Sequence, residues 1–161
     1  MIRTRFYPVI AVSILGGFIL WFAGVILQSH VFIETTQGIY QTIPVKDGEQ
    51  LSLSFIHSVQ RTPVIENFII EDSGIFILDS TEYQSFGVGL PFLTEDGIFQ
   101  AEKGKFVMRG MNRPQQCLRL RTGPEAKLSL TYAGRTIPLY SVFPAGTLVT
   151  VRVAPLYSRW F

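Results

Sequence analysis

The sequence has few of the residues from which metal and redox sites are built. Its 161 residues include a single cysteine, Cys117, and only two histidines. A lone cysteine excludes a disulfide within the chain and a cysteine-based zinc site, and two histidines fall short of the three or four ligands that zinc requires. Glu66, Glu82 and Glu95 have suitable oxygens for a hard cation, but no Asp-x-Asp-x-Asp loop supports a calcium site. We therefore expect no metal and no cofactor.

Charge of either sign is also scarce. Charged residues make up 16% of the chain and hydrophobic residues 47%, a balance that excludes a disordered chain and favours a membrane segment. Arg3 and Arg5 account for the whole net charge of +2, so the rest of the chain is neutral. A neutral body has no basic surface for nucleic acid, and we expect no nucleic-acid partner.

What the sequence does contain is one long apolar run. From Phe6 to Ile33 it has no Asp, Glu, Lys or Arg, which exceeds the ~20 residues that a membrane-spanning helix needs. Basic residues precede this run, and the next one after it is Lys46, so the positive-inside rule places the N-terminus in the cytoplasm. We expect a single-pass protein of the cell membrane, with residues 1–30 as cytoplasmic tip and transmembrane anchor and residues 31–161 as an extracytoplasmic domain.

A cleaved signal peptide is the alternative interpretation of this run. The apolar run is longer than the usual ~7–15 residues of a signal-peptide core, and no Ala-x-Ala-like cleavage site follows Leu27. The body lies outside the cytoplasm in both interpretations. The closing residues Trp160 and Phe161 would either pack on the domain or rest at the membrane interface.

After the apolar run, the hydrophobic pattern alternates with a period of two. Turn residues recur every 8–12 positions and no long helical period appears, which predicts an all-β domain, an antiparallel β-sandwich or small barrel of about 8–10 short strands. Turns are expected at Lys46–Gly48, Asp72–Gly74, Asn112–Pro114, Thr122–Pro124, Ala133–Arg135 and Pro144–Gly146. Strands are expected at 38–43, 50–56, 64–71, 75–79, 106–109, 116–121, 127–132, 136–140 and 148–153.

The polar stretch from His57 to Phe68 joins two of these strands. His57 shares its strand parity with Leu53 and Phe55, and Glu66 shares its parity with Phe68. An antiparallel register with His57 opposite Glu66 would match apolar with apolar side chains and place the imidazole beside the carboxylate. This pair is either a ligand site at the rim of the sheet or a structural pair that holds the strand register.

A hydrolase that uses His57, Glu66 or Ser58 is the enzymatic alternative. Neighbouring strand residues point to opposite faces, so Ser58 and His57 do not form a natural nucleophile–base pair. We therefore favour a non-enzymatic role.

Two further features complete the candidate site. Gly87-Val88-Gly89-Leu90-Pro91 lacks the third glycine and the helix of a nucleotide fingerprint, so we interpret it as a backbone turn that walls a pocket. Arginines between residues 109 and 121 are either a solvated sheet face or supply a carboxylate-binding group, for which Arg121 is the candidate. The candidate binding residues are His57, Ser58, Glu66, Gly87, Gly89, Pro91 and Arg121.

Several of these blocks resemble an uncharacterised bacterial family. The similar blocks are His57-Ser58-Val59 with Thr62-Pro63-Val64 and Glu66, then Ser85-Phe86-Gly87-Val88-Gly89-Leu90-Pro91, and later Leu120-Arg121-x-Gly123 and Gly134-x-x-Ile137-Pro138-Leu139. The family is a domain of unknown function that is often encoded beside tripartite ATP-independent periplasmic (TRAP) transporters of the TAXI type. One departure is Lys127, which stands where the resemblance leads us to expect a histidine.

The resemblance implies a context rather than an activity. It places the protein in the cell envelope near solute uptake, as an accessory to a TRAP-type transporter that contacts a transporter subunit or solute-binding protein, or binds a small solute. A purely structural surface domain is the remaining alternative.

Overall fold

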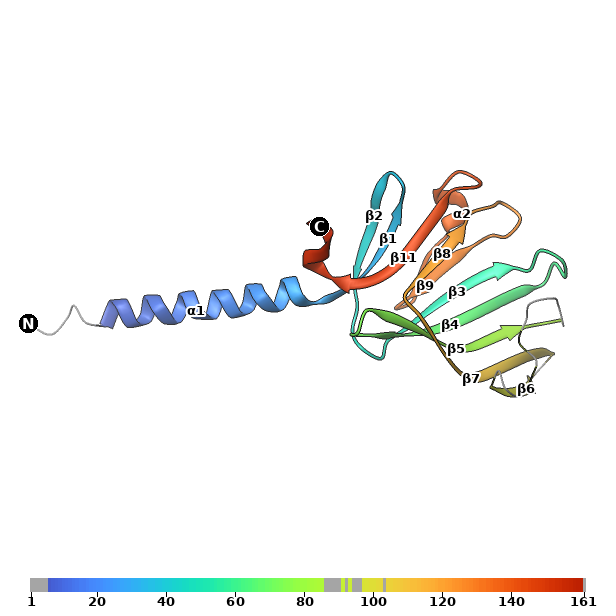
Figure 1. The fold of residues 1–161 in the computed structure, drawn as a ribbon, viewed down its shortest axis with the longest axis horizontal. Coiled ribbons are helices and arrows are strands. Elements are labelled where there is room, and N and C mark those ends of the chain that lie inside the picture. The colour runs from blue at the N-terminus through green and yellow to red at the C-terminus, as the bar shows by residue number, and fades with distance from the viewer. Residues whose placement is uncertain (1–5, 86–90, 92, 94–96, 103, 161) are drawn as a thin grey trace, which may run out of the picture.

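One apolar helix projects from a body of β-strands (Figure 1). The computed structural model describes the chain except residues 1–5, 86–90, 92, 94–96, 103 and 161. Helix α1 (Phe6–Leu27) is apolar on all sides, and its segment Ile10–Leu27 is long and apolar enough to cross a membrane. Leu20 and Trp21 remain 76% and 64% exposed, as expected of a helix whose neighbours are lipid rather than protein. The prediction of a membrane-length helix is confirmed, while its orientation stays a prediction.

The body consists of two antiparallel sheets, which confirms the predicted all-β class. The first sheet has four strands in the order β2-β1-β11-β8. Its strands are β1 (Ser29–Thr35), β2 (Gly38–Pro44), β8 (Cys117–Arg121) and β11 (Leu148–Pro155).

The second sheet has seven strands in the order β10-β9-β3-β4-β5-β7-β6. Its strands are β3 (Gln50–Ile56), β4 (Pro63–Glu71), β5 (Ile75–Tyr83), β6 (Ile98–Glu102), β7 (Lys105–Gln115), β9 (Ser129–Tyr132) and β10 (Arg135–Ile137). A short helix, α2 (Leu139–Val142), connects β10 towards β11, and a 3-10 helix, η2 (Leu156–Trp160), follows β11.

The core lies between the inner faces of the two sheets. Val31, Ile33 and Val151 of the first sheet join Leu51 and Phe68 of the second in one buried cluster. Burial of large apolar side chains is the main stabilising contribution here, at roughly 1.5–3 kcal/mol for each. On one side the chain passes directly from one sheet to the other, because a single residue separates β7 from β8. On the opposite side lie the edge strands β2 and β10.

One turn prediction and one strand prediction are wrong in an informative way. The turn predicted at Asn112–Pro114 is part of β7, where Pro114 pairs with Ile77. β7 pairs with β6 only over residues 105–109, so Pro114 lies where β7 has become an edge strand, the position at which a sheet tolerates proline. The strand predicted at 136–140 ends at Ile137, and α2 follows.

The C-terminal segment folds back beside the end of α1. The backbone N–H of Leu156 donates to the carbonyl of Gln28 at 3.0 Å, and η2 contacts α1. Tyr157 and Trp160 stay 42% and 65% exposed at this end of the body. Figure 1 shows the C-terminal segment next to the junction of helix and body. Both aromatic residues thus lie at the end of the body from which α1 projects.

Candidate functional site

His57 organises the loop between β3 and β4. Its backbone N–H donates to the carbonyl of Thr62 at 2.9 Å, and its own carbonyl accepts from Arg61 N–H at 2.9 Å. Its ring nitrogen Nδ1 accepts from the backbone N–H groups of Val59 and Gln60 at 3.3 and 3.2 Å. Two backbone donors thus converge on one ring nitrogen. Because the residue is only 9% exposed, the His57 side chain holds the loop in shape from inside.

A hollow of about 370 Å³ lies between this loop and the β8–β9 connection. These loops are at the end of the body opposite α1 (Figure 1). The two walls are tied together because Ile56 N–H donates to the Ala126 carbonyl at 2.7 Å. The walls combine apolar groups with polar ones, from Ile56, His57, Ser58, Arg61, Gly123, Pro124, Glu125 and Ala126. The hollow is of a size and character to receive a small polar solute or a side chain of a partner protein.

Arg61 and Glu125 face each other across the rim of this hollow. Arg61 Nη2 lies 3.9 Å from Glu125 Oε2, and both side chains are more than 70% exposed. Such an exposed and long ion pair contributes little to stability. The two side chains are therefore available to a partner at small cost.

Ser85, the first residue of the glycine-rich block, lies beside the His57 loop. Thr62 Oγ1 and Ser85 Oγ lie 3.0 Å apart and share a hydrogen bond. The hydroxyl of Tyr83, which is buried, donates to the carbonyl of Pro91. Thr62 and Ser85, which are 23 residues apart in the sequence, thus meet at one end of the body. Gly87 and Gly89 lie outside the described residues.

The predicted register that paired His57 with Glu66 is wrong. Glu66 pairs with Leu53, and Phe68 pairs with Leu51. No hydrogen bond or ion pair joins the His57 and Glu66 side chains among the described residues. The chain therefore turns earlier than parity alone suggested, directly after Ile56, which pairs with Pro63, and the two groups belong to different environments.

Glu66 instead lies on the inner face of the seven-stranded sheet. Its cross-strand neighbours are Leu53 and Thr81, which are 3% and 1% exposed. Within the described part of the chain its carboxyl group makes neither a hydrogen bond nor an ion pair. Burial raises the pKa of Glu66, because desolvation disfavours the charged carboxylate. Glu66 is a polar group in an apolar layer, without the imidazole that the sequence suggested.

Ser58 shows no sign of activation as a nucleophile. It is exposed at the rim of the hollow, and no hydrogen bond links its hydroxyl to His57 in the described structure. Nδ1 of His57 is already occupied by two backbone donors. A general base must reach the proton that it removes, and Nδ1 of His57 is not placed to act on the Ser58 hydroxyl.

Arg121 lies next to the hollow without lining it. Its guanidinium donates to the carbonyl of Gly146 at 2.8 Å. Thr122 supports the same turn, since its hydroxyl donates to the carbonyl of Pro144 at 2.7 Å. Arg121 thus stabilises the turn before β11 through this hydrogen bond. Its role in carboxylate binding stays a prediction.

The candidate metal ligands are dispersed or engaged elsewhere. Among the described residues, no group of three or more His, Cys, Asp or Glu side chains could hold a metal ion. Glu82 is paired with Lys105, and Nδ1 of His30 donates to the Gln28 carbonyl at 2.8 Å. Cys117 is a half-buried free thiol, and Glu95 lies outside the described residues.

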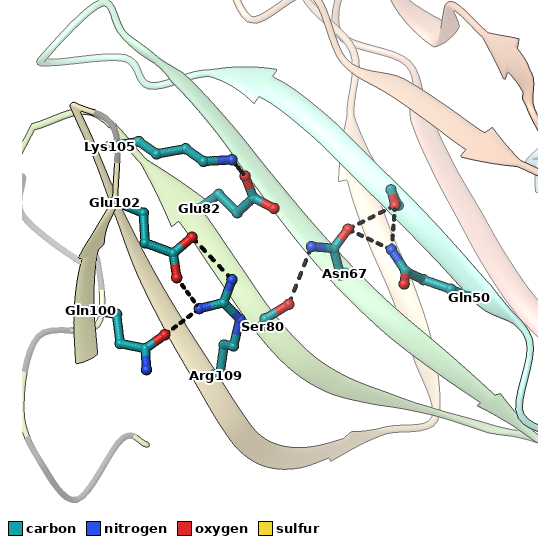
Figure 2. Close-up of polar contacts among 9 residues, drawn as sticks. Gln50, Asn67, Ser80, Glu82, Gln100, Glu102, Lys105 and Arg109 are labelled. Carbon is teal, nitrogen blue, oxygen red and sulfur yellow. Dashed lines mark hydrogen bonds and ion pairs between the residues drawn. The ribbon is translucent and has the colours of Figure 1, made fainter. Parts of the chain in front are cut away.

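Sequence reasoning missed a polar row on the outer face of the seven-stranded sheet, which Figure 2 shows. Asn67 is its centre: its side-chain oxygen accepts from Ser52 Oγ at 2.7 Å and from Gln50 Nε2 at 2.9 Å. Its amide nitrogen donates to Ser80 Oγ at 3.2 Å. Further along the sheet, Arg109 donates to Gln100 and, at 2.6 Å, to Glu102. The alternation of polar and apolar residues in the sequence could have indicated these outward positions. Only the strand register shows which polar side chains contact each other.

Together, the fold and this site define a two-sheet β-protein with a membrane-length helix at one end and, at the other, a hollow whose walls combine apolar and polar groups. The model of the family described as Domain of unknown function (DUF1850) matches residues 51–139, more than half of the chain. The protein belongs to this family. The match includes the His57 loop, Glu66, the glycine-rich block and Arg121. No curated protein and no solved structure matches the chain significantly.

Proposed function

We propose that this protein is a membrane-anchored extracytoplasmic accessory domain, without enzymatic activity, that serves a TRAP-type solute transporter. The transporter association rests on the sequence resemblance described above. The anchor rests on the length and apolar character of Ile10–Leu27. The orientation rests on Arg3 and Arg5, which precede the helix.

The observation that carries the proposal is the position of the His57 hollow. A single residue, Gln28, separates α1 from β1, so the body sits close to the bilayer. The hollow lies at the opposite end (Figure 1), and Arg61 and Glu125 at its rim are exposed. A surface held at this distance from the membrane is suited to a transporter component or a solute-binding protein that docks from the aqueous side.

The membrane-proximal end supports the same arrangement. Tyr157 and Trp160 are exposed beside the end of α1, and aromatic rings of this kind favour the membrane–water interface. Among the described residues at the junction, the basic Lys46 and Arg159 are accompanied by the acidic Asp47 and Asp72, a mixed charge that is compatible with an outward location. The body would thereby be held in one orientation above the bilayer.

Uptake and co-purification test the transporter association. Ser58→Trp would fill the hollow and Arg61→Ala would remove the rim cation, while the His57 hydrogen bonds remain. We expect both variants to reduce solute uptake by a TRAP-type transporter of the same cell, and to reduce its co-purification with the accessory protein from solubilised membranes. Arg119→Ala, an exposed arginine on β8, is the matched control and should behave as wild type.

Two results would contradict the proposal. The first is wild-type uptake and no co-purification when the gene is deleted. The second is a topology opposite to the expected one: in spheroplasts, added protease should degrade the body, and a fully protected body would place it in the cytoplasm. A melting curve for each variant separates loss of docking from loss of fold.

A further inference from the structure

A second hollow lies between the two sheets, at the side where β2 and β10 are the edge strands. It has a volume of about 500 Å³, within the ~300–1,000 Å³ range of small-molecule sites. We call it the inter-sheet slot. Its floor consists of inner-face side chains of both sheets, namely Val31, Ile33, Ile43, Leu51, Leu130 and Ile137.

Contacts between neighbouring segments involve both edges of this region. Tyr132 of β9, which lines the slot, donates its hydroxyl to Glu49, and Glu49 also accepts from the backbone N–H of Lys46 at 2.9 Å. Tyr40 of the edge strand β2 meets Phe143 edge to face, with ring centroids 5.0 Å apart.

Two polar side chains on the inner face stand at the mouth. Cross-strand pairing places Arg135 in the same row as Tyr132 and Leu51, and Gln41 in the same row as Ile33. Side chains that pair across a ladder share a face, so Arg135 and Gln41 project from the two edge strands on the slot side. Both line the slot and both are exposed.

Arg135 is the one charged side chain among the described residues that line the slot. It has no ion pair or hydrogen bond in the described part of the structure. Glu49, which does not line the slot, is bound by Tyr132 and Lys46. Burial, followed by the hydrogen bond and the charge of Glu49, raises the pKa of Tyr132 to about 12, so this hydroxyl stays protonated and bound to Glu49. One cation and one amide thus face an apolar floor.

We propose that the inter-sheet slot binds a small amphipathic monocarboxylate, with its apolar tail between the sheets and its carboxylate on Arg135 and Gln41. A guanidinium matches a carboxylate through two parallel N–H···O bonds, and the Gln41 amide supplies a further donor. The apolar floor selects a hydrocarbon tail, and the single cation selects a single negative charge. The slot is separate from the His57 hollow, so this inference does not depend on the proposed transporter association.

The competing explanation is that Arg135 is an inward-pointing charge that protects an edge strand from pairing with other chains. The two explanations differ in one measurable respect. Edge protection requires only charge at residue 135, whereas a binding site requires saturable affinity for an amphipathic anion.

Binding of octanoate to the full chain in lipid nanodiscs tests the proposal. With carboxyl-labelled octanoate followed by NMR, we expect saturable binding by wild type. Arg135→Gln should weaken it about tenfold or more, since hydrogen bonds to charged groups contribute ~1.5–3 kcal/mol. Gln41→Trp should block the mouth, and octanol, which lacks the charge, should compete poorly. Arg119→Gln should bind as wild type, and empty nanodiscs give the lipid background.

Three outcomes would overturn the inference. They are binding by wild type no greater than by empty nanodiscs, equal affinity of wild type and Arg135→Gln, and equal competition by octanol and octanoate. Thermal melting of Arg135→Gln and Gln41→Trp shows that the folds compared are intact. Both residues are exposed, so neither substitution disturbs the core.

Discussion

Glu66 and Asn67 are neighbours on β4 and show how differently the two faces of one sheet treat a polar side chain. Glu66 faces the core side, where its carboxyl group has no partner among the described residues and its pKa is raised by burial. Asn67 faces outward, yet it is only 9% exposed and makes three side-chain hydrogen bonds. Burial alone does not make a polar residue costly; burial without partners does.

Removal of the Asn67 amide is expected to cause the largest loss in the free energy of unfolding. Asn67→Ala should lower the free energy of unfolding by about 1–3 kcal/mol, because it leaves the nearly buried Ser80 without its donor. Denaturant unfolding measures the change. Thr136→Ala removes a hydrogen bond on the exposed edge strand β10, and it should cost no more than about 0.5 kcal/mol. If both variants lost the same free energy of unfolding, the buried hydrogen bonds of Asn67 would stabilise the fold no more than the exposed one of Thr136.

His57 allows the same comparison in the loop between β3 and β4, because it is nearly buried and its side chain has hydrogen-bond partners. His57→Ala should lower the free energy of unfolding by about 1–2 kcal/mol, since two backbone N–H groups lose their acceptor. His57→Asn retains a side-chain acceptor suited to such a turn and should recover part of this loss. Hydrogen exchange at Val59 and Gln60 should rise in the alanine variant. Unchanged exchange there would mean that the ring does not hold the loop.

Substitution of Glu66 is expected to change the free energy of unfolding least, and to raise it rather than lower it. A carboxyl group whose native pKa is raised binds more protons in the native than in the unfolded state, so stability falls as the pH rises through the interval above the ordinary value of 4.5. Glu66→Gln removes this titration and should stabilise the protein at neutral pH. Unfolding experiments at pH 4 and pH 7 should show a smaller difference for the variant than for wild type. A destabilised variant at pH 7 would indicate that the carboxylate has a favourable partner.

Period-two alternation was sufficient to predict the fold class, because it depends only on which residues face a core. The register of β3 and β4 was not predictable in the same way. The predicted pairing of His57 with Glu66 and the actual pairing of Leu53 with Glu66 differ by four positions on β3. An even shift leaves every apolar side chain on the same face, so hydrophobic matching does not distinguish the two registers. The hydrogen bonds of the His57 loop decide between them.

The candidate site stays a prediction, and only some of the contacts within it could be expected from the sequence. The sequence drew attention to the His57 loop and to the glycine-rich block, and the hydrogen bond between Thr62 and Ser85 shows that these blocks meet. It did not indicate the hollow formed with Pro124 and Glu125, because that wall belongs to a loop about 60 residues further along the chain. Polar residues along a strand reveal outward positions, but their partners depend on pairings between distant segments.

By itself, the sequence determined an apolar helix of membrane length and an all-β body, since both follow from local periodicity and composition. The tertiary structure alone decided that Glu66 is separated from His57, that Asn67 is the centre of a polar row, and that Arg135 and Gln41 face the inter-sheet slot. Each of these outcomes depends on which strands lie side by side and in which register. Those choices are made by loop hydrogen bonds and by packing between sheets, which no stretch of sequence contains on its own.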